Sequence, residues 1–216
     1  MPYISDLEVR SRDFVMSPTN ISPSRGRPRR FDPDQAVETA QQLFHTYGYD
    51  AVSVADVTGA LGINPPSFYA AFGNKAGLYL RVLDRYAKTG AIDLAGILRA
   101  DRPVAQCLIA VLEEAARRYA ANNGAVGCLV LEGTHSTDAG ARSVCCATHA
   151  AAEDVIRRYI AERHPEEAGR LTDFVSATMS GMSDKARNGQ DLDRLLATAR
   201  LAGLAIDQAL PAQALC

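Results

Sequence analysis

The sequence has no tryptophan, few aromatic residues and no long apolar segment, and these absences exclude several classes of protein. Aromatic residues make up 6% of the 216 residues. No uncharged apolar run approaches the roughly 20 residues that a membrane-spanning helix needs. The N-terminal residues contain no apolar stretch like that of a signal peptide. Five cysteines, an odd number, do not suggest a disulfide framework in a chain of this length. The sequence therefore predicts a cytoplasmic protein without a membrane partner.

The motifs of common enzyme and cofactor sites are absent as well. The 16 glycines are scattered along the chain and form no GxGxxG loop. We find no nucleophile elbow, no phosphate-binding loop and no H-E-x-x-H zinc motif. We therefore expect neither an enzyme nor a bound cofactor.

Alanine is abundant, and the apolar residues recur at helical spacing. There are 36 alanines, and alanine favours helices over strands. No segment shows the sustained alternation of apolar and polar residues that marks a half-buried strand. The composition and spacing together predict an all-α protein. The predicted helices cover residues 33–47, 53–61, 65–72, 75–88, 91–100, 103–121, 126–134, 142–163, 169–188 and 191–210.

Capping residues delimit the first three of these helices. Asp32 precedes Pro33, and Ser53 is followed three residues later by Asp56, which are two N-cap signals. Only Gly62 and Ile63 separate the second helix from Asn64 and the prolines that begin the third. Three helices in about 40 residues, the last two joined by a short turn containing glycine, are typical of a helix-turn-helix.

A basic segment precedes the first helix, although the net charge of the whole chain is −2. Four arginines fall within six residues, and Gly26 and Pro28 between them disfavour a helix. These arginines are Arg25, Arg27, Arg29 and Arg30. Such a segment is either a solvated tail or a flexible arm that binds nucleic acid.

Two segments carry a resemblance to a known family. Residues 48–64 (GYDAVSVADVTGALGIN) and 67–78 (SFYAAFGNKAGL) resemble the DNA-binding region of TetR/AcrR-family transcriptional regulators. The resemblance implies a flexible basic arm over residues 1–27 and a DNA-binding domain over 28–88, with the helix-turn-helix at about 53–72. It also implies a ligand-binding and dimerisation domain over 89–210 and a tail over 211–216. Met16 is a second expected start of translation, because residues from Ser17 onward read like an ordinary family lead.

The resemblance places the helix at residues 65–72 in the major groove of an operator. It implies that Tyr69 and Lys75 contact phosphates and that Ser53 caps the second helix near the DNA backbone. Pro65 and Pro66 lack backbone N–H groups, so base reading should depend on Asn64, Ser67 and apolar contacts to thymine methyl groups. We expect Arg25, Arg27, Arg29 and Arg30 to add contacts to phosphates or to an A·T-rich minor groove.

The resemblance further implies a homodimer on a pseudo-palindromic double-stranded operator, acting as a repressor that a small-molecule effector releases. The expected dimer interface consists of Phe174, Ala177, Thr178, Gly181, Leu195, Ala199 and Gly203. The expected effector pocket lies between the helices of residues 103–160 and includes Leu112, Tyr119, Leu131, His135, Cys146 and His149.

Two alternatives remain open from the residues alone. Cys145 and His149 lie one helical turn apart with Cys146 beside them, and these residue types are typical ligands of thiophilic metals or sensors of oxidants. The alternative is therefore a metal- or redox-sensing regulator. A helical adaptor that does not bind DNA is a further class, and salt-sensitive duplex binding distinguishes it from a regulator.

Overall fold

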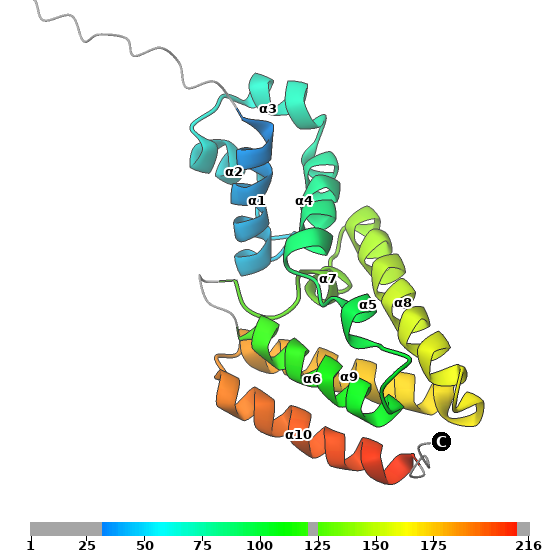
Figure 1. Ribbon diagram of the computed structural model, residues 1–216. Helices are drawn as coiled ribbons and strands as arrows, with labels where there is room; N and C mark the ends of the chain where they lie inside the picture. The colour runs from blue at the N-terminus through cyan, green and yellow to red at the C-terminus, as the bar shows by residue number, and fades with distance from the viewer. Residues whose placement is uncertain (1–31, 121–124, 211–216) are drawn as a thin grey trace, which may run out of the picture. The chain divides into compact units, whose positions relative to one another are not determined.

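The computed structural model describes residues 32–120 and 125–210, and every regular element in these two ranges is helical (Figure 1). The predicted all-α fold is confirmed. Arg25, Arg27, Arg29 and Arg30, the tail over 211–216 and Met16 lie outside the described residues. The helices are α1 (Pro33–Tyr47), α2 (Val54–Leu61), α3 (Pro65–Phe72), α4 (Lys75–Thr89), α5 (Leu94–Ile97), α6 (Val104–Tyr119), α7 (Leu129–Gly133), α8 (Ala139–Ala161), α9 (Ala168–Arg187) and α10 (Leu192–Ala209), with a 3-10 turn at Pro165–Glu167.

Capping residues lie at the helix starts that the sequence predicts. The Asp32 side chain accepts a hydrogen bond from the backbone of Asp34 at the start of α1. Ser53 and Asp56 form a capping box, because Ser53 Oγ accepts from the Asp56 N–H at 3.1 Å and Asp56 Oδ2 accepts from the Ser53 N–H at 2.8 Å. These local contacts fix the start of α1 and α2.

Two predicted helices are shorter in the structure. The helix predicted over 91–100 is reduced to α5, which Asp93 caps and which ends at Ile97. The helix predicted over 126–134 is reduced to α7, because Gly127 has φ +79°, a backbone conformation that breaks a right-handed helix. The helix predicted from residue 142 begins earlier, at Ala139, where Asp138 caps α8.

The first four helices share one apolar core. Phe44, Val57, Phe68 and Leu78, one from each of α1 to α4, are fully buried in it. The same core includes Leu129, Ala141 and Cys145 from α7 and α8. The predicted boundary between residues 88 and 89 falls at the end of α4, but the core of the N-terminal helices extends beyond it into the C-terminal half of the chain.

A second apolar core lies among the C-terminal helices. Helix α6 packs against both α9 and α10, and the three helices lie side by side (Figure 1). Leu108, Leu112, Val175, Leu195 and Ile206 are completely buried there. Within the described residues no helix is long and apolar enough to cross a bilayer.

Polar contacts join the N-terminal helices to residues far along the chain. His45 Nε2 lies 3.0 Å from the carbonyl oxygen of Gly127. The Asp50 carboxylate accepts hydrogen bonds from the hydroxyl of Ser136 at 2.7 Å and from the N–H of Thr137 at 2.6 Å. These donors hold the pKa of Asp50 at about 2. The loops that flank α7 are thereby fastened to the end of α1 and to the loop that follows it.

Candidate DNA-binding surface and ligand cavity

Gly62 and Asn64 determine how α3 follows α2. Gly62 has φ +64°, the left-handed conformation that ends many helices and favours glycine. Asn64 caps α3, because its Oδ1 accepts a hydrogen bond from the Ser67 N–H at 2.9 Å. The two helices are thus joined by a turn of three residues, which is the geometry of a helix-turn-helix.

The first turn of α3 offers no free backbone donor. Pro65 and Pro66 carry no N–H group, and the N–H of Ser67 is bound to Asn64. Phosphates bind at helix N-termini through such N–H groups. The N-terminus of α3 therefore cannot hold a phosphate in this way.

The outward face of α3 is mostly apolar. Phe68 and Phe72 are buried and anchor the helix to the core. The residues that α3 leaves exposed are Pro65, Pro66, Tyr69 and Ala70, and Tyr69 is 51% exposed. Asn64 is exposed and Ser67 is half-buried beside them. Three side-chain groups of this surface can hydrogen-bond to base edges, namely the Tyr69 hydroxyl, the Asn64 amide and the Ser67 hydroxyl.

Ser53 and Lys75 lie at the starts of the two helices that flank α3. Ser53 is exposed, but its hydroxyl is engaged with Asp56 Oδ2 at 2.6 Å. The Lys75 ammonium packs over the ring of Tyr49, with Nζ 4.0 Å from the ring centroid, and partial burial lowers the pKa of Lys75. Asn74 caps α4 by accepting from the Gly77 N–H at 2.7 Å. The cationic side chain is therefore held close to the end of α3.

Aromatic side chains connect Lys75 to the protein interior, a feature that our sequence analysis missed. The rings of Tyr49 and Tyr79 lie 4.6 Å apart, and the Tyr79 hydroxyl lies 3.4 Å from Cys145 Sγ. Burial raises the pKa of Tyr79, so its hydroxyl stays protonated. In the sequence, only the position of Tyr49 in the pair Gly48-Tyr49, which begins the motif GYDAVSVADVTGALGIN, indicates a structural role for this residue.

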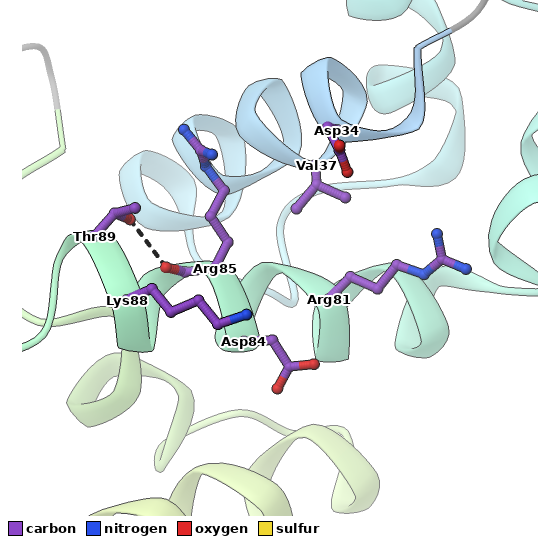
Figure 2. Close-up of a pocket in the computed structure, with 7 residues that line it drawn as sticks. All are labelled: Asp34, Val37, Arg81, Asp84, Arg85, Lys88 and Thr89. Atoms are coloured by element: carbon purple, nitrogen blue, oxygen red, sulfur yellow. Dashed lines mark hydrogen bonds between the residues drawn. The ribbon is translucent and has the colours of Figure 1, made fainter.

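A surface groove runs between α1 and α4, lined by side chains of both signs (Figure 2). Arg85 Nη2 lies 3.2 Å from Glu38 Oε1 of α1. The other charged residues at the groove are Asp34, Arg81, Asp84 and Lys88. Three bases and two acids line the groove, and Glu38 pairs with one of the bases, Arg85, so little net charge remains to bind an anion.

A mostly apolar cavity of about 120 Å³ lies among α4 to α8. Three of the predicted pocket residues line it, namely Tyr119, Leu131 and His149. Leu112, His135 and Cys146 are not among its lining residues. Leu112 is buried in the C-terminal core, and the other two are exposed. The lining residues that sequence analysis missed are Tyr86, Ala91, Ile92, Leu94, Cys128, Val130, Thr148 and Ala152.

The polar groups of this cavity are few. The Tyr86 hydroxyl donates to Cys128 Sγ at 3.6 Å. His149 Nε2 lies 3.4 Å from both Glu153 Oε1 and Ser176 Oγ, behind the cavity wall. Burial raises the pKa values of Tyr86 and Tyr119, so both hydroxyls remain protonated. The cavity therefore presents neutral hydroxyls within a largely apolar wall.

The metal-binding form of the cysteine alternative does not match the geometry, whereas nothing in the geometry tests the redox-sensing form, because Cys146 is exposed. Cys145 is completely buried and contacts Tyr79, whereas Cys146 is exposed and His149 turns toward Glu153. Adjacent residues of a helix point in directions about 100° apart, which separates the two thiols. Among the described residues, no three His, Cys, Asp or Glu side chains form a group that could hold a metal ion.

The predicted dimer interface requires a correction on α10. Leu195, Ala199 and Gly203 are buried inside the protomer, and a Cβ at Gly203 would lie 3.0 Å from Ile109 of α6. Their helical stripe packs on α6, so it is not available to a second subunit. On α9, Phe174, Ala177 and Gly181 are exposed and Thr178 is half-buried, as expected. The large apolar side chains that α10 leaves exposed are Leu192, Leu201 and Leu204.

Comparison with known proteins identifies the family. Residues 36–82 match the family profile described as bacterial regulatory proteins, tetR family. The chain is 60% identical over 181 residues to the HTH-type transcriptional repressor BdcR of Escherichia coli (strain K12), covering 84% of this chain and 92% of that protein. The chain belongs to the tetR family. The resemblance noted in the sequence is thereby confirmed.

Two further relatives of this tetR-family chain extend the comparison. It is 31% identical over 187 residues to the HTH-type transcriptional repressor ComR of Escherichia coli (strain K12), covering 82% of this chain and 89% of that protein. It also resembles a cysteine mutant of the TetR-family regulator CifR, in complex with 26-bp double-strand operator DNA, with 28% identity and a TM-score of 0.75. That match covers 83% of this chain and 99% of the CifR chain.

Proposed function

We propose that this tetR-family regulator is a repressor that binds a pseudo-palindromic operator as a homodimer and leaves it when a small molecule occupies the cavity among α4 to α8. The observation that carries the proposal is the capped helix-turn-helix, in which exposed Asn64, half-buried Ser67 and exposed Tyr69 lie at the start and on the outward face of α3. The names of BdcR and ComR as repressors support the direction of control. The operator complex of CifR supports duplex DNA as the partner.

The residues on and around α3 divide into two roles in this proposal. Ser67 and Asn64 read base edges, and exposed Pro66 and Ala70 contact the methyl groups of thymine. Tyr69 and Lys75 contact phosphates, together with the arginines of the N-terminal arm. Phosphate contacts position the protein without reading sequence. Only the residues that contact bases therefore determine which operator sequence is bound.

The dimer supplies two copies of α3 to the two halves of the operator. Phe174, Ala177 and Gly181 of α9 and Leu201 and Leu204 of α10 provide its interface in this proposal, since these apolar or small residues are exposed in the protomer. A twofold axis then relates the recognition helices and matches a pseudo-palindrome. The protein is a regulator rather than an enzyme and works in the cytoplasm, where its DNA is.

Selection of binding sites from random duplexes tests the proposal. We expect the wild-type protein to enrich a palindromic motif, Ser67→Ala to change its base preference, and Tyr69→Phe to weaken all duplexes alike while keeping the motif. A single base contact is worth about 1–3 kcal/mol of discrimination. Enrichment of the same motif with the same affinity by Ser67→Ala would show that α3 is not the reader, and no enrichment by the wild type would refute the proposed function.

A further inference from the structure

The described residues that line the cavity among α4 to α8 include no acid, no lysine and no arginine, and His149 is their one basic side chain. A cationic ligand would find no carboxylate on the wall, because Glu153 is not a lining residue and its Oε1 already contacts His149 and Ser176. An anionic ligand would approach His149, but the Glu153 carboxylate lies 3.4 Å from its Nε2 and repels a second negative charge. Burial of an unpaired charge in such surroundings is costly. The lining therefore selects an uncharged molecule.

The size of the cavity limits the ligand further. Its volume is about 120 Å³. An engineered apolar protein cavity of about 150 Å³ binds benzene. This cavity is smaller than that one, so a short chain fits without rearrangement, whereas a six-membered ring requires a small movement of the wall.

One hydrogen bond across the cavity wall is weak enough for a ligand to replace. Tyr86 of α4 donates its hydroxyl to Cys128 Sγ at 3.6 Å. Sulfur is a weak acceptor, whereas a carbonyl or ether oxygen accepts a shorter and stronger hydrogen bond. Tyr86 is 5% exposed and keeps its proton, so it is always a donor. A ligand oxygen inside the cavity would therefore compete successfully for this hydroxyl.

This bond also connects the cavity to the DNA-binding helices. Tyr86 lies near the end of α4, the helix that begins directly after α3. Its ring packs edge-on against His45 of α1 at 5.5 Å, and His45 contacts the carbonyl of Gly127. The N–H of Cys128 is bound to Ser183 Oγ of α9 at 2.9 Å. The segment around Cys128 is thus tied to α1, α4 and α9 at once.

We propose that the effector is a small uncharged molecule with a hydrogen-bond-accepting oxygen, and that it releases DNA by drawing the Tyr86 hydroxyl away from Cys128. This inference rests on the proposed function, because it needs an operator complex that a ligand dissociates. When Tyr86 binds the ligand, the bond between α4 and the segment before α7 is lost. Helix α4 can then shift against this segment, while the contacts of His45 and Asp50 remain in place, and this shift changes the spacing of the two recognition helices in the dimer.

A matched series of six-membered-ring compounds tests this chemistry. The probes are cyclohexanone as the neutral acceptor, methylcyclohexane without an acceptor, cyclohexylammonium as the cation and cyclohexanecarboxylate as the anion. Operator affinity is measured by fluorescence anisotropy with and without each probe. Thermal shift reports binding of the probe itself. We expect cyclohexanone to lower the affinity of the wild-type protein about fivefold or more, and the two ions to have no effect.

Tyr86→Phe is the decisive variant, and Tyr159→Phe is its control, because the Tyr159 hydroxyl donates to Arg99 O outside this cavity. Tyr86→Phe lacks the bond to Cys128 from the start, so we expect weaker operator binding without a probe and less than a twofold further change with cyclohexanone. Tyr159→Phe should respond like the wild type. An equal cyclohexanone response in Tyr86→Phe, an effect of either ion, or no response of the wild type to cyclohexanone would overturn the inference. None of these results affects the proposed function, which fails instead if the wild type binds no operator.

Discussion

Replacement of His45 by alanine should destabilise the protein more than replacement of any exposed histidine. His45 is 8% exposed, its Nε2 lies 3.0 Å from the carbonyl of buried Gly127, and its ring meets that of Tyr86 edge-on. His45→Ala leaves the Gly127 carbonyl buried without this partner, which costs about 1–3 kcal/mol. The lost ring contact adds about 0.5–1.5 kcal/mol. The free energy of unfolding should therefore fall by about 1.5–4.5 kcal/mol.

Urea unfolding followed by circular dichroism at a fixed protein concentration measures this loss. The matched control is His135→Ala, since His135 is exposed and its loss should change the unfolding free energy by less than about 0.5 kcal/mol. A loss below about 0.5 kcal/mol for His45→Ala, equal to that control, would refute the role given to the contact with Gly127.

The wild-type protein and His45→Ala should also differ in the pH dependence of their unfolding free energies. Burial lowers the pKa of His45 below 6.5, so the folded protein keeps this side chain neutral while the unfolded chain takes up a proton. The stabilising contribution of neutral His45 is therefore present above pH 6.5 and is lost as the pH falls below it. The difference in unfolding free energy between wild type and His45→Ala should shrink as the pH falls below 6.5, and a difference that grows would contradict this sign.

Three further predictions concern packing, acid stability and assembly. Gly133→Ala should lose about 1–3 kcal/mol in urea unfolding, because a Cβ there would collide with Cys145 Sγ. Gly59→Ala, which has open space around it in α2, should instead gain about 0.5–1 kcal/mol. The hydrogen-bonded carboxylate of Asp50 stabilises the folded state above pH 3.8 and loses this effect as the pH falls toward its pKa of about 2. Asp50→Asn should therefore flatten the pH dependence of unfolding in that range. Leu204→Glu should give monomers in analytical sedimentation under conditions where the wild type is dimeric, because it places a charge on an exposed apolar side chain of α10.

Local signals in the sequence account for the helix-turn-helix. The sequence predicts the caps Asp32 and Ser53 and the helix start at Asn64, because each of these side chains satisfies a donor within two or three residues of itself. Gly62 was placed correctly because a left-handed residue at a helix end strongly favours glycine. Features of this kind depend on neighbours in the chain, so a single sequence contains them.

Contacts between distant residues account for what sequence analysis missed. His45 and Gly127 are 82 residues apart, and nothing in the spacing of either residue indicates the other. Tyr86 belongs to the apolar stripe of α4, which shows that it faces inward but not that its hydroxyl reaches a cavity. Leu195 and Ala199 belong to an apolar stripe of α10 that is as regular as that of α4. Periodicity does not show whether such a stripe packs within its own protomer or against a partner subunit. The error at the dimer interface follows from that ambiguity.

Binding of the selected operator and of a scrambled duplex, followed by fluorescence anisotropy over a range of salt concentrations, tests the central claim most directly. Phosphate contacts make both complexes weaken as salt rises, whereas base contacts should keep the operator bound roughly 10³-fold or more tightly than the scrambled duplex. Ser67→Ala should reduce this ratio and leave the salt slope unchanged. Equal affinities for the two duplexes at every salt concentration would contradict the account, because α3 would then bind DNA without reading its sequence.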